Sequence, residues 1–458
     1  MTAIPRFIVA SPSSGHGKTA VTAGLLAALS SRGLKPAAFK IGPDYVDAGY
    51  LGLAGGRVGR NLDPQLTSPS LMSQLFAHGS QGADIAVVEG TLGLFDGLGG
   101  RADTESTAQV AGTLRAPVIL VVDCGYTGQS VAALVHGFKT FHEPLWLGGV
   151  ILTRVVSDRH EHILRESLDA IEVPVLGVLR RRDQVVLPPR AQGLVPVVER
   201  SVEAVRAIRR LGELMLDSVD IDRLLGICRS VPPLTSEPWS AESAIGDPVD
   251  FEGEEPPLVA VAGGNIFSYS YAESLELLQA AGAEIAVVDP LRDNALPPGT
   301  RALVFGGGFP EQYVDELSAN EELRDAVAEL ARSGAPVVAE SSGFLWLTKE
   351  YDNRPMGGVL DAEAHSSSML VLGYRNAVAQ SSSVIADDGD EMTGHKGHRS
   401  TVMPRTGDAA AWKWEGGQPE GYVWRNVHAS YLNLHWAGYP RIAHRVVAAA
   451  AAVAVPEI

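Results

Sequence analysis

The residues best suited to chemistry stand near the N-terminus, in the stretch RFIVASPSSGHGKTA. An apolar run gives way to small residues, and a lysine and a threonine then stand where a helix is expected to begin. In such a loop the backbone N–H groups surround a phosphate, the lysine contacts the β- and γ-phosphate oxygens, and the threonine hydroxyl faces Mg²⁺. The dipole of the following helix adds to the attraction. The residues predicted to bind the phosphates of ATP are Ser14, Gly15, Gly17, Lys18 and Thr19.

This phosphate loop departs from the usual pattern at one position. The glycine expected five residues before Gly17 is Pro12. The alternative interpretation is a glycine-rich turn ahead of a surface helix. The order of strand, loop and helix favours a phosphate loop, in which Lys18 is the catalytic cation.

Carboxylates follow two of the expected strands. The stretch IGPDYVDAGY puts Asp44 and Asp47 after one strand, and VVEGTLGLFDG puts Glu89 at the end of another, with Asp96 beyond. In doubly wound sheets, ligands bind outside the carboxyl ends of the strands. We therefore predict that Asp44 and Glu89, together with Thr19, hold Mg²⁺ on the ATP phosphates. The alternative is that Glu89 or Asp96 only caps a helix.

A second candidate site is the stretch VVAESSGFLW at residues 337–346. An apolar strand, a corner of small residues and an apolar helix start are typical of a nucleophile elbow. The corner residue is Ser341, while both cysteines of the chain, Cys124 and Cys228, lie far upstream. A serine hydroxyl is a weak nucleophile without a strong base.

Strands and helices that would position these residues alternate along the first half of the chain. Helical patterns cover residues 19–31 and 158–170. The expected strands are apolar throughout, as in a parallel sheet covered on both faces; they are residues 7–11, 37–41, 85–90, 117–123, 147–153 and 173–179. This βαβ series predicts a doubly wound α/β domain.

The character of the chain changes around residues 230–257, which are rich in Pro, Ser and acidic residues. We predict a first domain over residues 1–232, a linker over 233–257 and a second α/β domain over 258–458. The expected strands of the second domain are residues 258–263, 283–289, 302–308 and 336–341. After about Tyr351 the sequence is irregular and rich in Gly and Ser, with scattered strands expected.

Composition narrows the class of protein. The 458 residues are 45% hydrophobic and 20% charged, with a net charge of −17 and two cysteines. The negative charge argues against nucleic-acid binding. Apolar runs are too short to span a membrane, and so few cysteines fit a reducing cytoplasm. A dedicated protein-built metal site is not expected, because CxxC, HExxH and EF-hand patterns are missing.

Taken together, these motifs resemble the cobyrinic acid a,c-diamide synthases, which are glutamine-dependent amidotransferases of the corrin pathway. The likeness runs through HGKTAVTAGLLAAL, FKIGPDYVDAGY, GRNLDPQL, VVEGTLGLFDG and STAQVAGTLRAPVILVVD. After the linker it resumes in SLELLQAAGAEIAVVDPL, FGGGFPEQYVDELSAN, VVAESSGFLWL and SYLNLHW. It covers nearly the whole chain.

The resemblance implies a two-site enzyme. The first domain resembles the amide synthase domain of dethiobiotin synthetase type, which would phosphorylate a peripheral carboxylate of a tetrapyrrole-like macrocycle before ammonia displaces the phosphate. Tyr45, Asp47 and Asp96 are the candidates for substrate contacts. The second domain resembles the flavodoxin-like class I glutamine amidotransferases, in which N–H groups near a GGG turn stabilise an oxyanion. Gly307 and Gly308 fit that role.

Several residues depart from the family pattern. The elbow sequence of the family is AECGG, whereas this chain has AESSG, with Ser341 at the nucleophile position. Asn433 stands where the family often has the base histidine, and His435 two residues on is a candidate replacement or a packed structural residue. A GHEFHYS-like segment reads GHKGHRS, with Lys396 in place of an acid, and an RHLGL-like segment reads RAQGL, with Ala191 in place of a histidine.

These departures predict a chain that keeps ATP-dependent amide formation but has lost glutaminase activity. Ammonia would then come from solution or from a partner protein. Two alternatives stay open: a carboxylate–amine ligase acting on a different acid, and a non-catalytic, ATP-binding regulatory homologue. A homodimer is also possible.

Overall fold

A computed structural model describes residues 3–97, 106–141, 145–183, 185–188, 196, 201–251 and 255–453. The chain forms two compact units. The N-terminal unit is Met1–Pro64 with Ser68–Trp239, and the C-terminal unit is Ser240–Ile458 with Gln65–Thr67. In the described part of the chain, no helix has the length and apolar character needed to cross a membrane.

The N-terminal unit is built on a seven-stranded sheet with strand order β3-β2-β4-β1-β5-β6-β7. Every neighbouring pair in this sheet is parallel. The strands are buried and mostly apolar because helices cover both faces. Their bounds are β1 Arg6–Ala10, β2 Pro36–Ile41, β3 Arg60–Leu62, β4 Ile85–Glu89, β5 Val118–Asp123, β6 Leu147–Val155 and β7 Val175–Arg180.

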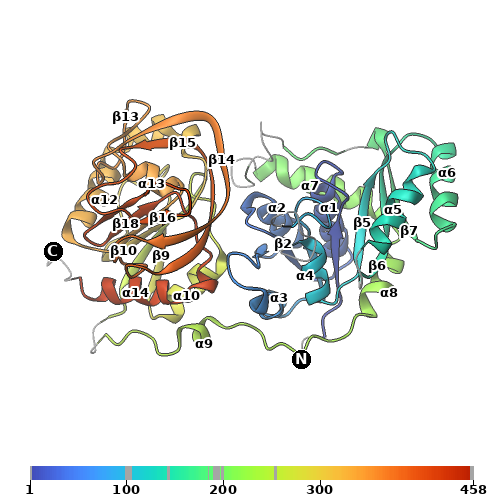
Figure 1. Ribbon diagram of the computed structural model, residues 1–458, viewed down its shortest axis with the longest axis horizontal. Helices are drawn as coiled ribbons and strands as arrows, with labels where there is room; N and C mark the ends of the chain where they lie inside the picture. Colours follow the sequence, from blue (N-terminus) through green and yellow to red (C-terminus); the bar gives the residue numbers. More distant parts are fainter. Residues whose placement is uncertain are drawn as a thin grey trace. The chain divides into compact units, whose positions relative to one another are not determined.

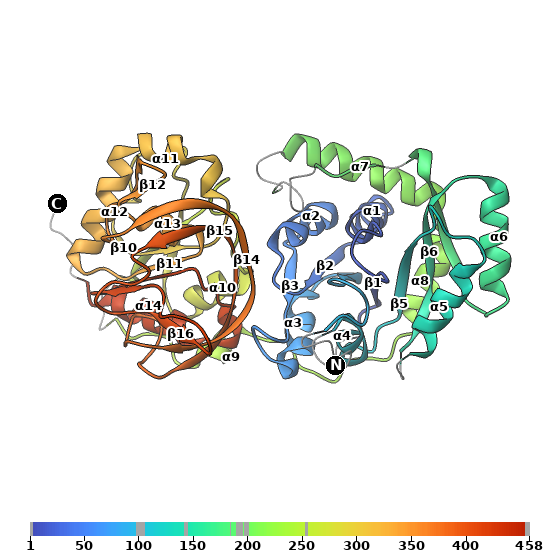
Figure 2. The same cartoon turned by 45° about the horizontal axis from the view of Figure 1, so that its top comes forward.

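Helices of this unit lie on the two faces of the sheet (Figures 1 and 2), with α1, α2 and α7 together on one face and α3 and α4 on the other. The apolar core lies between the sheet and α1, α2, α7 and α8. The helices are α1 Lys18–Ser31, α2 Tyr45–Gly55, α3 Met72–Gly79, α4 Thr107–Thr113, α5 Ser130–Thr140, α6 Asp158–Asp169, α7 Ser201–Ser218 and α8 Ile221–Arg229.

The C-terminal unit has a six-stranded sheet with strand order β17-β18-β11-β10-β8-β9. All neighbours in it are parallel except β17 and β18. The strands are β8 Leu258–Ala262, β9 Glu284–Val288, β10 Thr300–Phe305, β11 Val337–Glu340, β17 Tyr422–Trp424 and β18 Val427–Ser430. Its helices are α9 Ala241–Ile245, α10 Ala272–Ala280, α11 Val314–Ala319, α12 Glu321–Ser333, α13 Ser342–Leu347 and α14 Arg441–Ala451.

A second sheet in this unit has the order β13-β12-β14-β15, with β16 also paired to β14. Its strands are β12 Glu350–Tyr351, β13 Arg354–Pro355, β14 Glu363–Ala379, β15 Glu391–Met403 and β16 Trp412–Trp414. The long, curved β14 and β15 (Figure 1) form an antiparallel pair. The sequence predicted only scattered strands here. The long pair was missed because many β14 residues are exposed, which hides the apolar alternation of a half-buried strand.

The predicted α/β fold class is confirmed: each unit holds a largely parallel sheet, and every predicted apolar run is a strand of one of these sheets. The strands β3, β17 and β18 were not predicted. The predicted linker at residues 233–257 contains α9. The chain passes from one compact unit to the other at Trp239 and Ser240.

Candidate functional site

The predicted phosphate loop connects β1 to α1. Gly15 and Gly17 have φ values of 92° and 88°, and Gly17 is the residue that precedes α1. These left-handed values are costly for any residue with a Cβ, so the loop needs glycine at both positions. The loop therefore ends directly at the N-terminus of a buried 14-residue helix, which is the geometry that binds phosphate.

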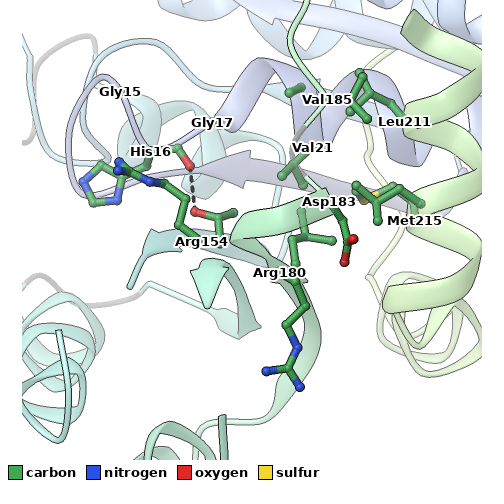
Figure 3. A pocket seen from close by; sticks show the side chains of 14 residues that line it. Gly15, His16, Gly17, Val21, Arg154, Arg180, Asp183, Val185, Leu211 and Met215 are labelled. Atoms are coloured by element: carbon green, nitrogen blue, oxygen red, sulfur yellow. Dashed lines mark hydrogen bonds between the residues drawn. The ribbon is translucent and has the colours of Figure 1, made fainter. Parts of the chain in front are cut away.

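His16 ties this loop to two neighbouring strands. Its Nδ1 accepts a hydrogen bond of 2.8 Å from the backbone N–H of Asp123, at the end of β5. Its carbonyl accepts one of 3.2 Å from the hydroxyl of Thr153 on β6 (Figure 3). Burial lowers the pKa of the His16 ring, in keeping with Nδ1 as an acceptor. His16 is thus a brace that holds the loop in shape.

Lys18 lies almost buried at the start of α1. Its Nζ donates to the carbonyl of Leu92 at 2.7 Å and to the hydroxyl of Ser11 at 3.3 Å. Burial, and then repulsion from Lys40, lowers the pKa of Lys18 to about 8. An ammonium that is partly desolvated and close to another cation gains strongly from a phosphate anion.

Next to Lys18, two carboxylates and a hydroxyl converge. The Thr19 hydroxyl donates to Glu89 Oε1 at 2.6 Å and lies 3.5 Å from Asp47 Oδ2. Lys40 Nζ bridges the same two oxygens, at 2.9 and 2.7 Å respectively. Burial lowers the pKa of Lys40, but Glu89 and Asp47 outweigh this effect and raise it well above its usual value. Lys40 is therefore charged.

The two aspartates of the IGPDYVD stretch have different surroundings. Asp44 caps α2, because its Oδ1 accepts the N–H of Asp47 at 2.8 Å. Asp47 is the residue whose carboxylate reaches the cluster. This geometry differs from the prediction, which paired Asp44 with Glu89 and left Asp47 for substrate. Tyr45 begins α2, half-buried.

Asp96 also has a local partner. Its Oδ2 accepts the backbone N–H of Gly93 at 2.8 Å. This contact closes the turn that follows β4, whereas the alternative kept in the sequence analysis was that Asp96 caps a helix. Ala191, which stands in place of a histidine in the RAQGL segment, lies outside the described residues.

Sequence reasoning missed Lys40. The signal was present, because a lysine in the middle of an otherwise apolar, fully buried strand needs a specific anionic partner. Which anions it would meet depended on strand order, since β2 and β4 are neighbours in space and far apart in sequence.

A pocket beside the phosphate loop was also missed. Its lining combines the loop with polar residues at or just beyond the C-terminal ends of β6 and β7 and with apolar side chains of α1 and α7 (Figure 3). Leu211 and Met215 of α7 face Val21 of α1, while Arg154 and Asp183 supply charge. Arg154 has a φ of 58° and pairs with Asp123 at 2.7 Å. The pocket therefore lies between the predicted phosphate loop and apolar side chains of α1 and α7.

In the C-terminal unit, Ser341 stands at the predicted elbow between β11 and α13. Its φ of 51° is strained for a residue with a side chain, and its N–H donates to the carbonyl of Ser430 at 2.8 Å. Gly343 must be small, because a Cβ there would lie 2.2 Å from the Cβ of Phe305. The backbone of a nucleophile elbow is present.

The chemistry expected around this elbow is incomplete. The N–H of Gly307 donates to the carbonyl of Tyr269 at 2.9 Å, so this predicted oxyanion donor already has a partner. At Gly308 an added Cβ would lie 1.5 Å from the carbonyl oxygen of Ile266. The segment before α10 therefore packs tightly over the GGG turn. In the described part of the chain, no hydrogen bond joins the Ser341 hydroxyl to a histidine.

Asn433 and His435 have separate surroundings. The Asn433 side-chain amide donates to Glu340 Oε2 at 2.7 Å. Glu340 also accepts from Leu434 N–H and Trp436 Nε1, and burial raises its pKa to about 8. His435 is fully buried, stacks on Tyr271 with ring centroids 3.9 Å apart, and lies 3.9 Å from Glu273. It is packed as a structural residue.

Comparison with known proteins agrees with both halves of this architecture. The family described as "CobQ/CobB/MinD/ParA nucleotide binding domain" matches residues 7–194, and "CobB/CobQ-like glutamine amidotransferase domain" matches residues 259–440. A hydrogenobyrinate a,c-diamide synthase of Streptomyces coelicolor is 52% identical, over 97% of both chains. The chain belongs to the cobyrinate and hydrogenobyrinate a,c-diamide synthase family. Other members are 45% identical, over 97% of both chains (Thermobifida fusca), and 39% identical, over 94% of this chain and 95% of the relative (Synechococcus).

One departure from the family pattern has a clear structural account. Lys396, which replaces an acid of the family segment, is buried and pairs with Glu420. Its ammonium also lies 4.7 Å from the ring centre of Trp414 and 5.2 Å from that of Tyr431. A buried lysine needs such partners. The substitution is therefore accommodated by an ion pair inside the C-terminal unit.

Proposed function

We propose that this chain is an ATP-dependent amide ligase that converts peripheral carboxylates of a corrin-type macrocycle to amides, with ammonia as the nitrogen donor. The observation that carries the proposal is the convergence of Lys18, Thr19, Asp47 and Glu89 beside a phosphate loop, in a chain 52% identical to a hydrogenobyrinate a,c-diamide synthase. Ammonia is chosen as the nitrogen donor because the elbow carries Ser341, a weak nucleophile for releasing ammonia from glutamine.

The first step is phosphoryl transfer. A substrate carboxylate oxygen attacks the γ-phosphorus of ATP, the bond to the β–γ bridging oxygen breaks, and ADP leaves with that electron pair. Lys18 and the N–H groups of the loop from Gly15 to Gly17 are the groups proposed to contact the β- and γ-phosphates. They stabilise the charge that spreads over the transferring group.

In the second step, ammonia attacks the carbonyl carbon of the acyl phosphate and phosphate leaves. A free carboxylate has no comparable leaving group, which is why the first step is needed. Ammonia that enters as ammonium must lose a proton before it attacks. The source of nitrogen is proposed to be solution or an ammonia-supplying partner.

Mg²⁺ fits the cluster around Thr19. It prefers oxygen ligands and keeps several sites for phosphate and water. Glu89 Oε2 is buried and has no hydrogen-bond partner in the described part of the chain, so a cation would satisfy it. We propose that Thr19, Asp47 and Glu89 face the metal, which neutralises charge on the phosphates, and that Asp44 serves α2 instead.

The pocket next to the loop suits the base and ribose of the nucleotide. It opens beside His16 and Gly17 and is walled by Val21, Leu211 and Met215. A flat, largely apolar base would lie against these side chains, while Asp183 offers an acceptor to an exocyclic amino group. ATP is therefore the proposed nucleotide.

Two further features of the earlier prediction remain proposals. A cytoplasmic location is supported by two buried cysteines that form no disulfide. A homodimer stays a prediction that size-exclusion chromatography with light scattering would test.

The decisive experiment measures ADP release by the full chain with Mg-ATP and hydrogenobyrinic or cobyrinic acid. Parallel reactions contain glutamine or ammonium chloride, and product mass is read from the same tubes. We expect turnover with ammonium and a mass change of one or two amidations. Equal turnover with glutamine would contradict the loss of glutaminase activity. ADP release only with non-corrinoid acids would show that the substrate is a different carboxylic acid. No ADP release with any acid would favour a regulatory role.

A further inference from the structure

Lys40 holds the two carboxylates of the nucleotide site together. Its ammonium lies 2.7 Å from Asp47 Oδ2 and 2.9 Å from Glu89 Oε1, and its third contact is the carbonyl of Gly90 at 3.2 Å. The lysine and Glu89 are buried, with 4% and 0% of their surface exposed. A cation and two anions are thus packed with very little water.

The oxygens that Lys40 holds are the same ones that face Thr19. The Thr19 hydroxyl is 2.6 Å from Glu89 Oε1 and 3.5 Å from Asp47 Oδ2. A metal ion bound by this hydroxyl and by both carboxylates would therefore lie against Glu89 Oε1 and Asp47 Oδ2, which the ammonium now occupies, as well as against Glu89 Oε2. Two cations cannot share those oxygens at contact distance without strong repulsion.

We propose that Lys40 is the counter-cation of this site and that Mg²⁺ replaces it when the metal–nucleotide complex binds. Without metal, the ammonium balances Asp47 and Glu89 and keeps both ordered. When the metal arrives, Lys40 gives up these two oxygens and keeps the Gly90 carbonyl. Lys40 thereby lowers the affinity of the empty site for metal and makes metal entry depend on the phosphate oxygens that arrive with it.

This inference rests on the proposed Mg-ATP site, but its test separates the two. The full chain and the variant Lys40→Met are unfolded thermally with and without MgCl₂ and no nucleotide. The variant leaves two buried carboxylates without a counter-charge, so it should melt at a lower temperature than the parent and regain more of its stability on adding Mg²⁺. Equal Mg²⁺ shifts in the two proteins would overturn the inference.

A second readout is binding of a fluorescent, non-hydrolysable ATP analogue as a function of Mg²⁺ concentration. Removing the competing cation should lower the half-saturating Mg²⁺ concentration about tenfold in Lys40→Met. Lys35→Met, at an exposed lysine just before β2, is the matched control and should leave it unchanged. If the parent chain binds no analogue, the proposed function fails. If the parent chain binds the analogue and Lys40→Met needs the same Mg²⁺ concentration as the parent, only the proposed replacement of Lys40 by Mg²⁺ fails.

A crystal structure of the parent chain with Mg²⁺ and the analogue does not depend on the variant's folding. The exchange requires the distances from Lys40 Nζ to Asp47 Oδ2 and Glu89 Oε1 to exceed 4 Å or so, beyond ion-pair contact. Lys40 still in contact with both oxygens, and the metal bound elsewhere, would contradict it.

Discussion

The two units contain the same kind of backbone device with different side chains on it. In each, a parallel strand leads to a buried helix through a residue with a positive φ: 88° at Gly17, after the loop of residues 11–17, and 51° at Ser341, directly after the strand. Around the first turn, Lys18, Thr19 and two carboxylates converge. Around the second, the N–H of Gly307 is already paired, and no histidine among the described residues hydrogen-bonds to the Ser341 hydroxyl.

This contrast teaches that the backbone of a catalytic turn and its chemistry are separable. The turn at Ser341 is maintained by packing, because Gly343 lies against Phe305 and the strand pairs with β18. None of these contacts involves the nucleophile side chain. Packing therefore holds the elbow whatever side chain stands at its corner, whereas the phosphate site depends on the charged groups themselves.

The largest expected effect comes from Lys18→Ala. Loss of the cation that is proposed to contact the phosphates should reduce ammonia-dependent turnover about 100- to 1000-fold. ADP release measures it, with circular dichroism to verify folding. Ser341→Ala is the matched variant and should leave ammonia-dependent turnover unchanged. A comparable loss in both variants would mean that the elbow still takes part in amide formation.

A second prediction concerns the pH dependence of the C-terminal unit. Burial raises the pKa of Glu340 from 4.5 to about 8, so between these values the folded protein holds a proton that the unfolded chain has released. Stability must therefore fall as pH rises from about 4.5 toward 8, by a few kcal/mol. Urea unfolding followed by fluorescence at several pH values measures this, since five of the seven tryptophans lie in this unit.

The matched variant for that experiment is Glu340→Gln, which carries no titratable proton. The difference in unfolding free energy between parent and variant should change across this window, and the variant's own slope should be flatter. A parallel pH dependence in the two proteins would show that Glu340 does not carry the effect.

A substitution that disturbs the packing beneath the elbow should lower the stability of the C-terminal unit moderately. In Gly343→Ala the new methyl would meet the Cβ of Phe305 at 2.2 Å, which should destabilise the C-terminal unit by about 1–3 kcal/mol. Denaturant midpoints measure it. Gly112→Ala is the control, because a Cβ there meets open space. An unchanged midpoint for Gly343→Ala would show that this turn is not held by the packing described above.

The smallest expected effect is that of Ser341→Cys. A thiol at this position should give no measurable glutamine hydrolysis, because catalytic groups that act as a unit have little effect singly, and Asn433 stands where the sequence analysis predicts the family's base histidine. Glutamate release is the assay, and Ser341→Cys with Asn433→His sharpens it. Substantial hydrolysis by the single variant would mean that the site lacks only its thiol.

Much of the fold was predictable because its signals are local. Every strand expected in the first half of the chain is present, and the helix expected over residues 19–31 is α1, Lys18–Ser31. Apolar runs and glycine turns report on the conformation of neighbouring residues. The β14–β15 pair was missed because its exposed surface hides the alternation, and β3 because three residues carry little pattern.

The sequence by itself determined the phosphate loop, the elbow and the buried strands, since each depends on residues close together in the chain. Only the tertiary structure decided that Asp47 rather than Asp44 meets Glu89, that Lys40 lies between them, and that Tyr269 takes the N–H of Gly307. The physical reason is that side chains converge through strand order and loop packing. Neighbouring strands such as β2 and β4 are brought together by the sheet, and no local pattern records which carboxylate will face which cation.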